Sequence, residues 1–275
     1  MKRMFTFAAM AVLALTSCKT TPPVENKDKV VTGLITEDTY WYADTAYEMA
    51  GKVVVEEGAT LFIEAGTTIK ARDGQGSLST ALIIAQGGRI QAVGTADAPI
   101  VFTSIYDEDQ LDEGDQGLWG GVVILGYAPI SADAATALIE GLPANLGYGE
   151  YGGSNIHDNS GVLKYVSIRH AGTLLGDGNE LNGLTLGGVG SATVIDQIEV
   201  VGNLDDGIEF FGGTVNASNL LVWAQGDDAF DIDQAYAGII SNFVNVEGSE
   251  SDHALEIDGP EGTYEDSFVM ENGIL

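Results

Sequence analysis

The second half of the chain repeats one short motif at nearly constant spacing. LDDGIEF at 204–210, GDDAFDI at 226–232 and SDHALEI at 251–257 align without gaps, with offsets of 22 and then 25 residues. ELNGLTL at 180–186 fits the same frame 24 residues earlier. Each string alternates apolar and polar residues, as a short strand does. Repeats of this length, rich in glycine and without helical periodicity, predict a parallel β-helix in which each repeat stacks on the previous one.

An earlier pair of segments supports this architecture. Val53, Val55, Leu61 and Ile63 match Leu82, Ile84, Ile90 and Ala92, each 29 residues later. We therefore expect residues 31–275 to form one β-helix domain. The final string, FVMENGIL, is typical of the start of another repeat and offers no polar cap, so we expect the domain to be incomplete at its C-terminus.

Strand alternation sends every second side chain of a repeat toward the interior and the others outward. Two inward columns follow: Ile208 with Phe230 and Leu255, and Phe210 with Ile232 and Ile257. The acids between them, Glu209, Asp231 and Glu256, form a column that points outward. Adjacent rungs lie about 4.8 Å apart, so neighbouring acids repel by about 1 kcal/mol per pair even in water. Some interaction must offset this repulsion.

The charge of the chain limits its partners. The formal net charge is −30, and all 11 Lys and Arg residues lie at or before Arg169. Residues 171–275 contain twenty Asp or Glu residues and no Lys or Arg. We expect no nucleic-acid partner, because phosphate binding depends on basic side chains that release counterions. The same argument disfavours any polyanionic ligand that lacks a bridging cation.

The first residues are typical of an exported bacterial lipoprotein. A basic start, Lys2-Arg3, precedes an apolar stretch too short to span a bilayer. The string LTSC then resembles the bacterial lipobox, and Cys18 is the only cysteine in the chain. We expect residues 1–17 to be the signal peptide and residues 18–30 the lipidated Cys18 with a flexible tether. Lys19 and the absence of an acidic run after Cys18 favour the outer membrane, on its periplasmic side rather than the cell surface.

Several long strings occur in an order that is similar to a known family. GATLFIEAGTTIKA, GTADAPIVFTS, LWGGVVILG, NGLTLGGVG, DDGIEFFGGTVNASNL and DDAFDIDQAYAG together resemble a family of Bacteroidota right-handed parallel β-helix lipoproteins, from about Val31 to Glu247. The resemblance implies an all-β, right-handed parallel β-helix in the cell envelope and no particular activity. We therefore expect a lipid-anchored protein whose lateral face is a binding or structural surface, with the membrane and a glycan or envelope protein as partners.

The acidic column also resembles, more distantly, the active site of polygalacturonase-type glycoside hydrolases. Asp206, the pair Asp227 and Asp228, and His253 fall where that family carries acids and a histidine on successive rungs. The resemblance implies Asp228 as the acid, Asp206 and Asp227 as groups that position or activate water, and His253 as a group that tunes them. The family's Asn-Thr and Arg-Ile-Lys elements are absent here, which puts uronate binding in doubt.

The sequence leaves three interpretations of residues 205–256 open. In a structural interpretation, exposed acids are screened by salt and aspartates bind turn amides. In a cation-site interpretation, Glu209, Asp231 and Glu256 supply oxygen ligands to Ca²⁺, which takes six to eight oxygens. In a glycan-active enzyme, an acid and a base about 6.5–9.5 Å apart would hydrolyse a glycosidic bond by inversion.

Aromatic residues offer one more candidate surface. Trp41, Trp119 and Trp223, with the string YWY at 40–42, would suit stacking on sugar rings. Trp119 leads into an apolar strand, so we expect it to lie in the core or at a cap.

Cys18→Ala should abolish lipidation and leave a protein that is lost from the membrane fraction, because the only predicted anchor is the acyl chains on Cys18. Cell fractionation followed by immunoblotting measures this. A variant that remains fully membrane-bound would contradict the lipobox interpretation.

Overall fold

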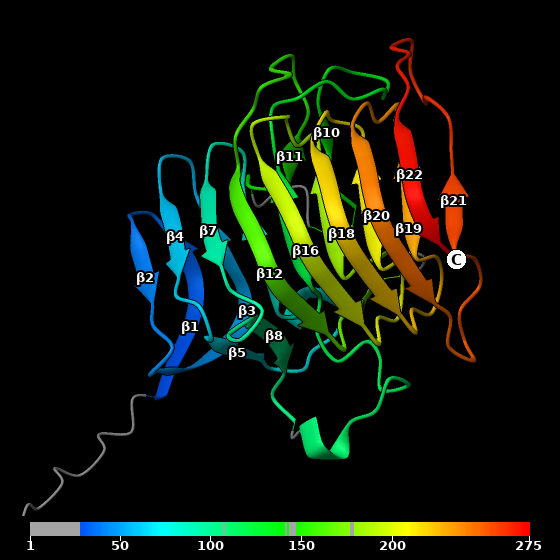
Figure 1. Cartoon of the computed structure of the whole chain (residues 1–275). Coiled ribbons are helices and arrows are strands. Elements are labelled where there is room, and N and C mark those ends of the chain that lie inside the picture. The colour runs from blue at the N-terminus through cyan, green and yellow to red at the C-terminus, as the bar shows by residue number, and fades with distance from the viewer. Residues whose placement is uncertain (1–27, 107, 141, 143–146, 177–178) are drawn as a thin grey trace, which may run out of the picture.

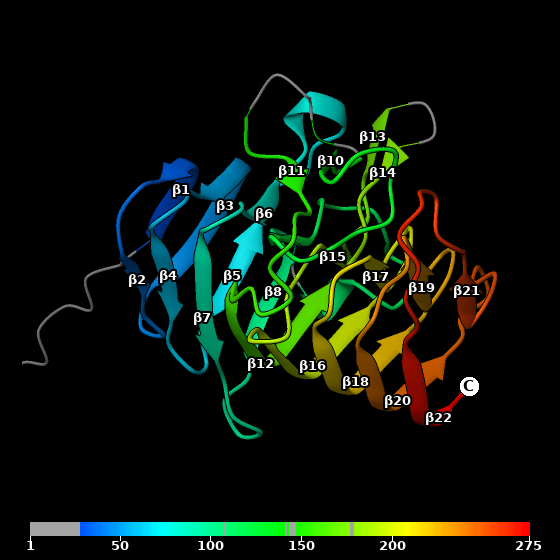
Figure 2. The same ribbon diagram turned by 90° about the horizontal axis from the view of Figure 1, so that it is seen from above.

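The computed structural model describes residues 28–106, 108–140, 142, 147–176 and 179–275, so the predicted signal peptide, Cys18 and most of the tether lie outside the described residues. The described chain is all-β apart from two short 3-10 helices, η1 (Gly76–Leu78) and η2 (Glu108–Gln110). Its strands stack in parallel around one solenoid with three faces (Figures 1 and 2). The predicted parallel β-helix is confirmed. Among the described residues, no helix is both long and apolar enough to cross a bilayer.

The first face carries the acidic column. It consists of the second halves of β1 (Asp28–Ile35) and β3 (Ala46–Val55), followed by β6 (Ala81–Ile84), β9 (Val122–Leu125), β15 (Leu184–Gly187), β17 (Ile208–Phe211), β19 (Phe230–Asp233) and β21 (Leu255–Ile257). Val53 pairs with Leu82, and Phe230 pairs with both Ile208 and Leu255. The strand registers therefore confirm both sequence alignments.

The other two faces share long strands that bend. The second face contains β2 (Thr39–Trp41), β4 (Thr60–Ile63), β7 (Arg89–Val93) and the first halves of β12 (Gly161–Arg169), β16 (Val194–Val201), β18 (Asn216–Trp223), β20 (Ile239–Val246) and β22 (Val269–Ile274). The third face contains the first halves of β1 (Asp28–Ile35) and β3, then β5 (Thr68–Ala71), β8 (Ile100–Ser104) and the second halves of those long strands. In β18 and β20 the bend falls at Asn219 and Asn242, each at φ 56°, a left-handed conformation that asparagine tolerates better than most residues.

The solenoid interior is filled by the predicted apolar columns, with one exception. Ile208, Phe210 and Phe230 are fully buried, and Ile232 is 1% exposed. Leu255 is partly buried. Ile257 keeps its place in the predicted column as the register partner of Ile232, but its side chain is 54% exposed, so the expectation that it is buried was wrong. The reason is its place on β21, the last strand of the first face in the described chain, where no following rung covers it.

The predicted tether is shorter than expected at its C-terminal end. Strand β1 begins at Asp28 rather than after residue 30, and Asp28 and Lys29 pair with Ala46 and Tyr47 of β3. This pairing gives the backbone of residues 28–30 hydrogen-bond partners, which a flexible tether would lack.

A second hydrophobic cluster covers the outside of part of the first face. Val54, Ile83 and Val123 point outward there and pack with Ile139 and Tyr151 from the segment between β9 and β12. That segment contains a short antiparallel pair, β10 (Ala137–Leu138) with β11 (Glu150–Tyr151), and a second pair follows, β13 (Leu174–Gly176) with β14 (Asn179–Glu180). The covering segment lacks the repeat period, and the sequence alignment did not predict it.

Ile232→Ala should lower the free energy of unfolding by about 2–5 kcal/mol, because it leaves a cavity in the packed interior. Ile257→Ala, the matched change one rung further along the same column, should cost less than about 1 kcal/mol because its side chain is already exposed. Denaturant unfolding of both variants measures the difference. Equal losses would contradict the assignment of Ile257 to an open edge.

Candidate functional site

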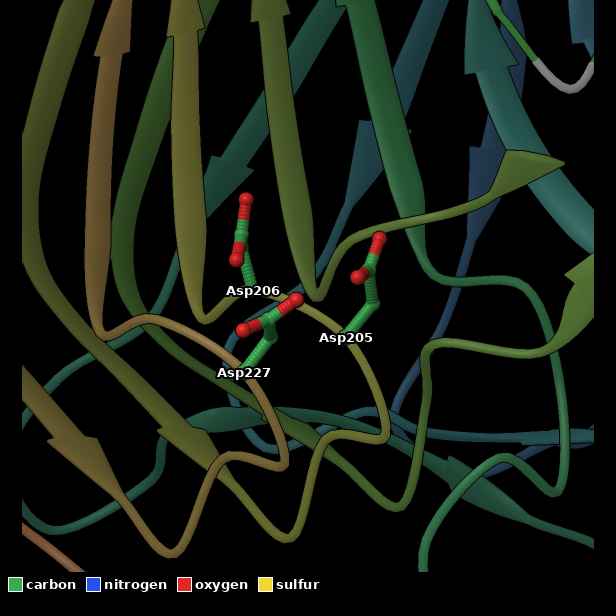
Figure 3. A group of neighbouring side chains, drawn as sticks. All are labelled: Asp205, Asp206 and Asp227. Atoms are coloured by element: carbon green, nitrogen blue, oxygen red, sulfur yellow. The ribbon is translucent and has the colours of Figure 1, made fainter. Parts of the chain in front are cut away.

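Three aspartates meet where the chain turns into the first face. Asp205 and Asp206 lie in the turn before β17, and Asp227 lies in the next turn, before β19 (Figure 3). A carboxylate oxygen of each lies within 4.8 Å of the other two. The backbone fixes this arrangement in part, since the amide of Asp228 donates a 3.0 Å hydrogen bond to Oδ1 of Asp206. Stacked turns therefore bring acids of adjacent repeats together.

A second group of acids continues along the strands. Glu209 and Asp231 are register partners on β17 and β19, and their carboxylates lie within 4.8 Å of that of Asp206. Asp206 belongs to both groups, so five acids form one continuous acidic site: Asp205, Asp206, Glu209, Asp227 and Asp231.

Two of these acids are buried although they lie outside the solenoid interior. Asp206 is 7% exposed and Glu209 is 5% exposed. The side chain of Asn182 covers Glu209 from the preceding rung, with its Nδ2 donating to Oε2 of Glu209. Glu140, from the covering segment, is close enough to raise the pKa of Glu209 further. Alternation correctly placed Glu209 on the outer side, but the cover leaves it shielded from solvent.

Burial and neighbouring negative charges raise the pKa values of Asp206, Glu209 and Asp231. Loss of solvation is the main cause for Asp206, whose pKa rises to about 9, with the neighbouring charge of Asp205 adding to it. Glu209 has a pKa well above its usual range for the same main reason. The pKa of Asp231 rises to about 6, again mainly through burial, although a hydrogen bond from Glu209 opposes the rise. Without a cation, protons must therefore neutralise part of this site near neutral pH.

Two oxygen atoms at the site have no hydrogen-bond partner in the described part of the chain. They are Oδ1 of Asp231 and Oδ1 of Asn182, both buried. An unpaired buried oxygen costs free energy unless something satisfies it. The carboxylates of Asp206, Glu209 and Asp231 form a hard donor set of the kind that Ca²⁺ prefers.

Asn182 is a site residue that the sequence interpretation missed. In the aligned repeats it occupies the position of Asp206, Asp228 and His253, one repeat earlier than Asp206. It is 1% exposed, and Asp228 is also 1% exposed. The alignment itself was therefore the signal that could have included Asn182 in the site.

The structure regroups the predicted ligands and the catalytic candidates. Glu256 is exposed and lies outside both carboxylate groups, whereas Asp206 joins Glu209 and Asp231. Asp228 is buried, and its Oδ1 lies 3.1 Å from Nδ1 of His253. The charges of Asp252 and Asp228 raise the pKa of His253, whose side chain is exposed.

In the absence of divalent cations, the protein should lose stability as pH rises from about 4, the unfolded pKa of aspartate, to about 9. A raised folded pKa means that the protonated form stabilises the fold, so the contribution of Asp206 is lost as the group ionises. Asp206→Asn should therefore be more stable than the parent at pH 8, by on the order of 2–4 kcal/mol, and equal to it below pH 4. Unfolding in chelator across this pH range measures the effect, with exposed Asp252→Asn as the control. A variant less stable than the parent at pH 8 would refute the assignment.

The comparisons with known proteins agree with the architecture. Residues 33–273 match a family described as a pectate-lyase like beta helix domain. No curated protein and no solved structure matches the chain. The match spans the strands of all three faces and includes every residue of the acidic site. The chain therefore belongs to the pectate-lyase-like β-helix domain family.

Proposed function

We propose that this protein is a lipid-anchored β-helix of the cell envelope that presents a binding or structural surface. Its first face binds a divalent cation, and Ca²⁺ is the cation that we propose. One observation carries the proposal: Asp206, Glu209 and Asp231 converge within 4.8 Å while two of them are buried. Carboxylates that lie this close together and are this well shielded from solvent need a cation or bound protons to neutralise their negative charge.

The chain supplies little positive charge of its own near this site. Residues 171–275 contain no Lys or Arg. Lys164 forms an ion pair with Asp196 of β16, and Arg169 forms one with Glu199 of the same strand. Three carboxylates supply several of the six to eight oxygens that Ca²⁺ takes, and water would complete the set. A cation here would also allow the acidic surface to bind an anionic partner.

The envelope location rests on the N-terminal sequence. The basic start, the short apolar stretch and the LTSC string before residue 19 support export and lipidation at Cys18. Strand β1 begins at Asp28, so about ten residues would separate the anchor from the solenoid. We propose the outer membrane, periplasmic side, with a glycan or an envelope protein as the partner of the exposed faces.

A glycan-active enzyme is the second candidate. The family description and the contact of His253 with Asp228 favour it, because a paired histidine and aspartate suit proton transfer. The burial of Asp228 weighs against its role as the acid, since its carboxylate contacts His253 and Glu256 rather than solvent. The acidic surface would also repel polyuronates unless a cation bridged them.

Millimolar Ca²⁺ should raise the unfolding midpoint of the purified protein, and Asp231→Asn should remove most of this gain. A ligand that binds only the folded state stabilises it by RT ln(1 + [L]/Kd), so a site of about 0.1 mM would add about 2.7 kcal/mol at 10 mM. Glu256→Gln is the matched control, because Glu256 lies on the same column but outside the carboxylate groups. It should keep the gain.

Thermal unfolding in chelator and in Ca²⁺ measures all three proteins. An unchanged midpoint in the parent protein, or an equal gain in Asp231→Asn, would contradict the cation site. If only Glu256→Gln loses the Ca²⁺-dependent rise in the unfolding midpoint, the cation binds at the exposed end of the column instead.

A further inference from the structure

An acidic cavity beside the turns that lead into the first face contains an exposed tryptophan. The cavity has a volume of about 340 Å³ and lies between the segment after η2 and the turns that follow β18 and β20. Trp223, at the end of β18, is 39% exposed and lines it together with Asp112, Glu113, Glu247 and Glu250. In Figure 1 the segment that carries η2 lies at the lower end of the solenoid, toward which β16, β18 and β20 point. We propose that this cavity binds a small organic cation of the alkylammonium class.

Both walls of the cavity are held in place by hydrogen bonds to the same turn. On one side, Nε2 of Gln116 donates a 2.8 Å hydrogen bond to the carbonyl of Ala224, directly after Trp223. On the other side, Oγ of Ser251 donates to the carbonyl of Gln225 at 2.6 Å and accepts from the amide of Gly248 at 2.9 Å. The cavity is therefore formed before a ligand arrives, which lowers the entropic cost of binding.

The charge and the aromatic ring select the same kind of ligand. Four acids line the cavity and no Lys or Arg does. The nearest base along the strand column of Trp223 is Arg169, two rungs away, and its NH2 nitrogen lies 3.2 Å from Oε2 of Glu199. A tryptophan face attracts cations more strongly than other rings, and attracts alkylated ammonium groups, whose hydration is weak, better than strongly hydrated metal ions.

Choline and tetramethylammonium test this site, and Trp223 itself reports on them. Trp41 and Trp119 are 1% and 0% exposed, so a saturable change in tryptophan emission should come from Trp223. Both cations should produce it, whereas NaCl at equal ionic strength and the uncharged isostere of choline, with a tert-butyl group in place of trimethylammonium, should not. No saturable change, or an equal response to the isostere, would overturn the proposal.

Saturation transfer to the methyl protons of choline provides a readout that does not depend on tryptophan. Trp223→Leu should abolish it, and Glu247→Gln should weaken the affinity roughly two- to fivefold, as expected for one exposed charge. Glu265→Gln, an exposed acid outside the cavity, should leave it unchanged. Unchanged binding in both Trp223→Leu and Glu247→Gln would overturn the proposal, and parent-like unfolding midpoints would confirm that these variants fold.

The alkylammonium group could belong to a lipid headgroup or to a soluble molecule, and vesicle binding distinguishes the two. Sedimentation of the Cys18→Ala variant with phosphatidylcholine vesicles, but not with phosphatidylglycerol vesicles, would identify a lipid headgroup as the ligand. Binding of free choline without vesicle sedimentation would identify a soluble ligand.

Discussion

Parallel stacking of rungs controls the whole molecule, because it places the same position of successive repeats about 4.8 Å apart. Inside the solenoid this is favourable, since Ile208 lies beside Phe230 and Phe210 beside Ile232, and each rung buries the next. Outside, the same geometry places Glu209 beside Asp231 and Asp231 beside Glu256. A repeat that builds a good core therefore also builds a column of like charges, unless the outward residue changes from rung to rung.

The outward residue does change along the first face, and this change produces the site. From β3 to β21 the outward column reads, in register order, Val54, Ile83, Val123, Thr185, Glu209, Asp231 and Glu256. The apolar half is covered by the segment between β9 and β12, and the acidic half becomes exposed where that cover ends. Glu209 lies at the boundary, so it combines a charged side chain with a buried position. The raised pKa of Glu209 results from this boundary.

The sequence predicted the regular part of the molecule and missed the irregular part. Offsets of 22, 24, 25 and 29 residues predicted the strand registers, because a one-residue slip would send the apolar columns outward. Alternation also predicted which side of the sheet carries Glu209. It could not predict the burial of Glu209, because the covering segment has no repeat period and its contacts are long-range. The exposure of Ile257 was missed for a related reason, since burial in a solenoid depends on the neighbouring rung rather than on the residue itself. Asn182 was missed because the first repeat carries an amide where later repeats carry acids or histidine.

Calorimetric titration of the purified chain with CaCl₂ at pH 7, in two buffers of different ionisation enthalpy, tests the central claim most directly. If a cation neutralises the acidic site, binding should saturate near one ion per chain. The heat should differ between the buffers, because carboxyl groups with raised pKa values release protons as the cation binds. Asp206→Asn should remove both the heat and the proton release. Absence of saturable binding at millimolar Ca²⁺, or unchanged binding in Asp206→Asn, would contradict the account and leave protons as the only counter-charge of the column.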